Sequence, residues 1–156
     1  MRVYLVQHGV AKTKEEDPAR PLTPEGREEV ERVARTAAAR GVRPAVILHS
    51  GKARAQETAE ILAAHTRPED GLRAVKGLAP DDAPRRARKR IEEARGPLML
   101  VGHLPHLGRL ASLLLTGSDE GEIVAFRKGG VVCLERGDED ERFAVAWLLT
   151  PELVAP

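Results

Sequence analysis

Residues 3–9 read VYLVQHG, four apolar residues followed by Gln7, His8 and Gly9. A short apolar run that is rich in β-branched and aromatic residues and closed by a glycine is typical of a buried strand. Residues 45–48 (AVIL) form a second run of this kind. The pattern therefore predicts buried strands that are followed by polar side chains able to take part in binding or catalysis.

Helical patterns lie between the strands. Thr23 and Pro24 predict a helix N-cap followed by proline at the first helical position. The apolar stripe that follows has helical spacing, and Gly41 supplies a stop. We expect further helices around residues 55–62, 83–94 and 107–114, and a strand at 97–101.

The C-terminal part has a different pattern. Residues 131–135 and 143–149 are apolar and flank the acidic segment 137–141, which predicts a hairpin. Alternating strands and helices with short connections indicate a single three-layer α/β/α domain over residues 1–156. We expect a mostly parallel sheet that ends in an antiparallel pair, without a large lid insertion.

Composition narrows the function classes. Lys and Arg total 25 against 24 for Asp and Glu, a formal net charge of +1, which argues against nucleic acid or a membrane as the main partner. Cys133 is the only cysteine and sits in an apolar run, which favours a buried residue over a reactive thiol. We expect a cytoplasmic protein without a signal peptide. The absence of Asn and the high charge are typical of a thermophile.

One basic run stands out at residues 85–90. Its apolar members keep helical register, so the charges are expected on a solvated helix face. A docking surface for an anionic partner is the alternative.

Two histidines follow predicted strands. His8 comes after the first strand and His103 follows the strand at 97–101, and each lies beside a glycine. Ligands of open α/β sheets bind at the carboxyl ends of strands. The neighbouring glycines are expected to let a ligand approach the backbone closely.

Four motifs in order carry a family resemblance: residues 7–9 (QHG), 20–23 (RPLT), 50–59 (SGKARAQETA) and 101–105 (VGHLP). Together they resemble the histidine phosphatase superfamily, with the phosphoglycerate mutase-like fold, and within it the small SixA-type phosphohistidine phosphatases. The similarity extends from Val3 almost to the C-terminus.

The resemblance implies roles for individual residues. His8 matches the nucleophile that becomes phosphorylated, and a neutral imidazole suits that role. Arg54 matches the arginine that grips the phosphoryl oxygens, and His103 matches the second histidine of the pocket. Arg20 matches a further arginine near the site, with a surface arginine as the alternative.

Gln7 departs from the family pattern, which usually has arginine immediately before the nucleophile. An amide can donate hydrogen bonds to a phosphoryl oxygen but supplies no charge. Three consequences are possible. Turnover is slower, the substrate is different, or Arg20 or Lys52 compensates for the missing charge.

A general acid is harder to assign. Asp17 and the Asp81–Asp82 pair are the candidates, and solvated loop carboxylates are the alternative for each. A site formed by His8, His103 and His106 could hold a metal, but no carboxylate shares the motif and the family chemistry needs none. We therefore expect neither a metal nor a cofactor.

The expected activity is a metal-independent phosphatase that works through a phosphohistidine intermediate on His8. A phosphohistidine on a protein is the expected substrate, since imidazole needs less proton assistance to leave than an alkoxide. The alternatives are a phosphomonoesterase for a small phosphate ester, and a weakly active regulator that binds phosphate or a phosphoprotein because Gln7 replaces arginine.

Overall fold

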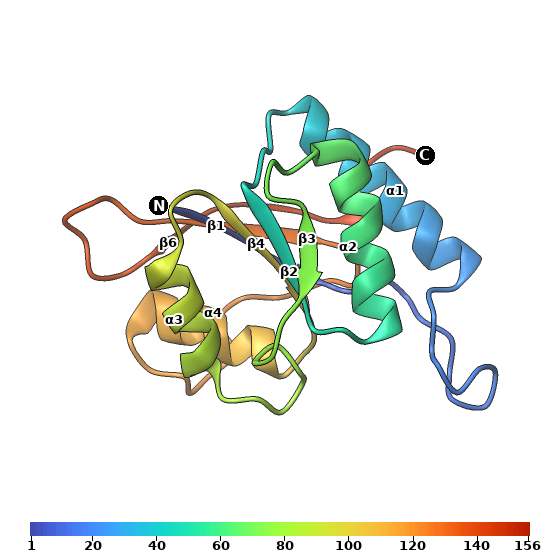
Figure 1. The fold of residues 1–156 in the computed structure, drawn as a ribbon, viewed down its shortest axis with the longest axis horizontal. Coiled ribbons are helices and arrows are strands. Elements are labelled where there is room, and N and C mark those ends of the chain that lie inside the picture. Colours follow the sequence, from blue (N-terminus) through green and yellow to red (C-terminus); the bar gives the residue numbers. More distant parts are fainter.

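The computed structural model describes residues 1–156 as one layered α/β unit. Figure 1 shows a central sheet seen nearly edge-on, with α1 and α2 on one side and α3 and α4 on the other. The strands are β1 (Arg2–Gln7), β2 (Val46–His49), β3 (Leu72–Ala74), β4 (Leu98–Gly102), β5 (Val131–Glu135) and β6 (Ala144–Leu149). The helices are α1 (Pro24–Ala39), α2 (Ala53–Thr66), α3 (Pro84–Glu93) and α4 (His106–Thr116), with a short 3₁₀ turn, η1, at Pro151–Leu153.

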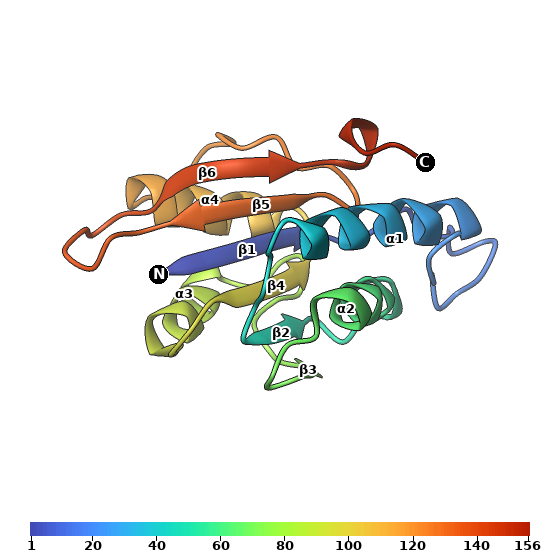
Figure 2. The same ribbon diagram turned by 90° about the horizontal axis from the view of Figure 1, so that it is seen from above.

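The six strands follow the order β3-β2-β4-β1-β5-β6, which can be traced across Figure 2. The pairs β3-β2, β2-β4 and β4-β1 are parallel, whereas β5 is antiparallel to both β1 and β6. The predicted three-layer fold with a mostly parallel sheet is therefore confirmed, as is the C-terminal hairpin.

Side chains alternate between the two faces of the sheet, as the two-residue period of a strand requires. From β1, Tyr4 and Val6 enter the apolar layer under α1 and α2, and Val3 and Leu5 enter the layer under α3 and α4. Both layers are closed by the apolar stripes of their helices. The sheet is thus rigidly held from both sides, and its carboxyl edge presents the strand ends at fixed positions.

Local signals explain where the helices begin. The Thr23 hydroxyl accepts a hydrogen bond from the amide of Gly26 (2.9 Å), and Pro24 occupies the first helical position, as predicted. Helix α3 is shorter than the predicted range, because Ala83 and Ala94 are its capping residues. The exposed charges of the basic run lie on this helix, as expected for a solvated face.

Strand β3 was not predicted. It has three residues and only one of them, Leu72, is strongly apolar, so it lacks the pattern of a strand. Among the helices, none combines the length with the apolar character that crossing a bilayer requires.

Candidate functional site

The carboxyl edge of the sheet brings the two strand-end histidines together. In the β1-β4 register Gln7 lies opposite Gly102, so His8 and His103 leave the sheet side by side. The amide of His8 donates to the carbonyl of Gly102 (3.1 Å), and the two imidazole centroids are 5.1 Å apart. Both side chains are buried, with 8% of His8 and 2% of His103 exposed.

One ring nitrogen of His8 is fixed by the backbone. Its Nδ1 lies 2.7 Å from the carbonyl oxygen of Gly9, which can only accept, so Nδ1 carries the proton. The lone pair is therefore on Nε2, which forms no hydrogen bond within the protein. Burial lowers the pKa of His8 to about 4, and the positive charges of Arg54, Lys128 and Arg20 act in the same direction. At neutral pH, His8 presents a neutral imidazole with a free nitrogen.

His103 is held by a serine from the neighbouring strand end. Its Nε2 lies 2.7 Å from the Oγ of Ser50, which also accepts from the amide of Lys52 (3.3 Å). Burial and the proximity of His8 lower the pKa of His103 to about 3. Its Nδ1 is buried without a hydrogen-bond partner. The ring is thus a neutral, oriented group.

Arg54 lies in the first turn of α2, and its buried Nε has no hydrogen-bond partner in the protein. Burial, and then the charge of Arg20, lowers the pKa of Arg54. Arg20 comes from the loop between β1 and α1, where its Nε donates to the carbonyl of Lys12 (3.1 Å). Two guanidinium groups that repel each other beside a free imidazole form a site suited to an anion.

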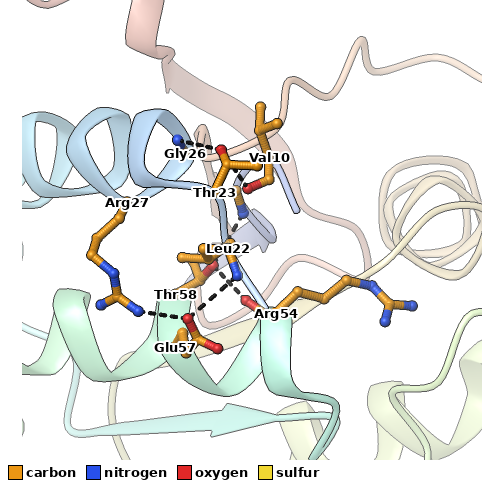
Figure 3. A network of polar contacts seen from close by, with 9 residues as sticks. Val10, Leu22, Thr23, Gly26, Arg27, Arg54, Glu57 and Thr58 are labelled. Carbon is orange, nitrogen blue, oxygen red and sulfur yellow. Dashed lines mark hydrogen bonds and ion pairs between the residues drawn. The ribbon is translucent and has the colours of Figure 1, made fainter. Parts of the chain in front are cut away.

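Hydrogen bonds through Thr58 connect the start of α2 to the chain next to His8 (Figure 3). The fully buried Thr58 hydroxyl accepts from the amide of Gly9 (3.0 Å) and donates to the carbonyl of Arg54 (2.8 Å). In Figure 3 the side chain of Arg54 extends away from this network, beyond the start of α2. Thr58 therefore joins the backbone of Arg54 to that of Gly9, the residue after His8, and leaves the guanidinium outside these hydrogen bonds.

Glu57 connects the same helix to the loop before α1. Its Oε1 accepts from the amide of Leu22 (3.3 Å) and from Nη2 of Arg27 (2.6 Å), as Figure 3 shows. This loop carries Arg20, so the contact helps to hold Arg20 near α2.

The glycines beside the two histidines are closely packed against other elements of the fold. A Cβ atom at Gly9 would lie 2.7 Å from Cγ2 of Val30 in α1, and one at Gly102 would lie 3.3 Å from the carbonyl oxygen of Leu78. A side chain at Gly9 would therefore force Val30 to shift, and one at Gly102 would make a tight contact with the backbone of Leu78. The expected close approach of a ligand is not needed to explain them.

Gln7 is buried, with 7% of the residue exposed, and its side-chain amide forms no hydrogen bond with the protein. Lys128 was not identified from the sequence, although its charge lowers the pKa of His8. It precedes Gly129, whose amide donates to the carbonyl oxygens of Gln7 (2.9 Å) and His8 (3.2 Å). Only the antiparallel pairing of β5 with β1 could have revealed this position.

Two of the candidate acids, Asp17 and Asp82, form hydrogen bonds within their own loops. The carboxylate of Asp17 accepts from the amide of Ala19 (3.0 Å), and that of Asp82 accepts from the amide of Ala79 (2.9 Å). No carboxylate is among the groups that shift the pKa of His8 or His103. His106 is fully buried at the start of α4, and no group of three or more His, Cys, Asp or Glu side chains is placed to hold a metal ion.

The two lowered pKa values make stability depend on pH. Between pH 6.5 and about 4 the unfolded chain protonates its histidines, whereas His8 and His103 stay neutral in the native state. The free energy of unfolding is therefore expected to fall as the pH is lowered through this window. Urea unfolding of the protein and of a His8→Asn variant from pH 7 to 4 measures the effect. The variant should lose less stability, and equal pH slopes would refute the assignment.

Comparisons with known proteins identify the family of the chain. Residues 3–102 match the sequence profile of the Histidine phosphatase superfamily (branch 1). An uncharacterized protein of Picosynechococcus sp. is 33% identical over 145 residues, which cover 88% of this chain and 86% of that protein.

Two solved structures share the fold. The protein histidine phosphatase SixA complexed with tungstate has a TM-score of 0.85 at 23% identity, covering 98% of this chain and 99% of that chain. The alpha-ribazole phosphatase of Shigella flexneri has a TM-score of 0.78 at 15% identity, covering 97% of each chain. One fold thus serves phosphatases with different substrates.

Proposed function

Since the chain belongs to the histidine phosphatase superfamily, we propose that it hydrolyses phosphohistidine on a protein through a covalent intermediate on His8. One observation carries the proposal. A neutral His8 with a free Nε2 lies among the positive charges of Arg54, Lys128 and Arg20, which act on its imidazole.

The proposed reaction has two displacements at phosphorus. The lone pair of His8 Nε2 forms a P–N bond as the bond between phosphorus and the leaving group breaks. A water molecule then attacks phosphorus, the P–N bond to His8 breaks, and inorganic phosphate leaves. Arg54 and Arg20 would neutralise the phosphoryl oxygens, and His103 would donate a hydrogen bond to the developing charge.

The chemistry of the leaving group favours a substrate with an N–P bond. When the other ring nitrogen of phosphohistidine carries a proton, the electron pair of the broken P–N bond passes to nitrogen and a neutral imidazole leaves. The conjugate acid of this imidazole has a pKa of ~6.5, so little further proton assistance is needed. An alkoxide requires a positioned acid. The carboxylates of Asp17 and Asp82 both bond within their loops. The arrangement therefore favours phosphohistidine over a sugar phosphate.

A substrate comparison tests the proposal. We expect kcat/KM for a short phosphohistidine peptide to exceed that for a panel of sugar phosphates by about 10²-fold, the order that general acid catalysis contributes. Steady-state phosphate release measures both. Higher efficiency on any of the sugar phosphates would favour the phosphomonoesterase instead.

Gln7→Arg tests whether the missing cation limits turnover. Hydrogen bonds to charged groups contribute roughly 1.5–3 kcal/mol, so a guanidinium that reaches the phosphoryl group would raise kcat/KM by about 10- to 10²-fold. Gln7→Met, which is similar in size but has no donor, is the matched control and should lower it. A Gln7→Arg variant without any gain would contradict the idea that the missing cation limits turnover.

A further inference from the structure

A groove of 520 Å³ opens between the start of α4 and the segment that precedes β5. One wall is formed by Leu104, Pro105, Gly108 and Arg109, and the other by residues in the range 119–127. Leu104 is 43% exposed, so the groove offers apolar surface to solvent.

Each wall of the groove begins next to a residue of the candidate site. Leu104 directly follows His103 in the chain, and Arg127 directly precedes Lys128, whose charge acts on His8. Consecutive Cα atoms are about 3.8 Å apart, so each wall begins within one residue of the phosphoryl site. A chain attached to the reacting phosphoryl group is therefore within reach of this groove.

The charges of the groove do not suit a second anionic group. Arg109 pairs with Asp119 (2.8 Å) and Arg127 pairs with Glu152 (3.6 Å). Glu122 lines the groove and forms no ion pair. The unpaired charge is thus negative, which would repel the further phosphates or carboxylates of many metabolites.

The aromatic content does not suit a nucleobase either. Phe126 is the only aromatic residue of the groove and is 8% exposed, so it offers little ring surface for stacking. What remains is a mixed apolar and polar channel, large enough for a few side chains of a polypeptide.

We infer that this groove binds the polypeptide that flanks the phosphohistidine of the substrate, with an apolar side chain packed against Leu104. The inference rests on the proposed function, since it identifies how that same site recognises its protein substrate. According to this inference, the segment after His103 and the segment before Lys128 determine which protein substrate is bound.

The test compares two phosphoryl donors, a phosphohistidine peptide with leucine on both sides and phosphoramidate, which has no group to enter the groove. Gly108 is in α4, where an added Cβ meets only Leu104 Cδ2 at 3.9 Å, so Gly108→Phe fills the groove with little disturbance. We expect it to lower the ratio of kcat/KM for peptide over phosphoramidate by about tenfold. The matched control Ala39→Phe, at an exposed helical position in α1, should leave the ratio unchanged.

A second pair of variants tests the contact without filling the groove. Leu104→Ala should lower the same ratio by about threefold or more, the order expected for lost apolar contact. Leu148→Ala is its control, since Leu148 is 39% exposed on β6.

The inference is overturned if neither groove variant changes the ratio while the unmodified protein cleaves both donors. It is also overturned if the variants impair a sugar phosphate and spare the peptide. A protein that cleaves neither donor would instead refute the proposed function, and the inference with it.

Discussion

His8→Asn is expected to lower kcat for phosphohistidine hydrolysis by about 10⁴-fold or more, because loss of a covalent nucleophile removes the pathway itself. The asparagine amide can still donate to the carbonyl of Gly9, as Nδ1 of His8 does at 2.7 Å. The fold of the site should therefore survive the change. Stopped-flow and steady-state phosphate release measure the loss.

A histidine elsewhere provides the control for this variant. His65 lies in α2 and pairs with Glu31, outside the candidate site. His65→Asn should retain full activity, which would show that the loss is specific to His8. If His8→Asn retained more than about one hundredth of the original rate, His8 would not be the nucleophile.

Arg54→Ala is expected to lower kcat/KM by about 10²- to 10³-fold, the range found when a donor to developing charge is removed. The buried Nε of Arg54 has no hydrogen-bond partner in the protein, so truncation of the side chain breaks no hydrogen bond at this atom. Only the backbone carbonyl of Arg54 enters the network with Thr58, and alanine preserves that contact. The loss should thus be one of catalysis and not of folding.

Arg54→Lys separates charge from geometry. A lysine restores the positive charge but not the planar pair of donors, so we expect partial recovery of kcat/KM. Arg35→Ala, at an exposed position in α1, is the control and should have no effect. Equal rates for Arg54→Ala and the unmodified protein would remove Arg54 from the mechanism.

The sequence predicted most of the fold because its signals are local. Apolar runs, helical stripes and the Thr23 cap each specify an element from neighbouring residues, and the structure contains all of them. β3 was missed because a strand of three residues is stabilised by pairing with β2 and not by its own pattern.

The site was only partly predictable for the same reason. The strand ends pointed to His8 and His103, and the resemblance pointed to Arg54 and Arg20. The bond between His103 and Ser50 joins residues from different strands, which no local pattern indicates. Lys128 reaches the site through the register between β5 and β1. The His103–Ser50 bond and the position of Lys128 both depend on how the strands pair in the folded sheet.

The most direct test of the central claim is to trap the phosphoenzyme. The protein is mixed with phosphoramidate, quenched rapidly in alkali, digested and analysed by mass spectrometry under conditions that preserve phosphohistidine. We predict one phosphorylated peptide, the one containing His8, with the modification formed and lost at rates that account for turnover. Turnover without any phosphoryl group on His8, or with the group on another residue, would contradict the account.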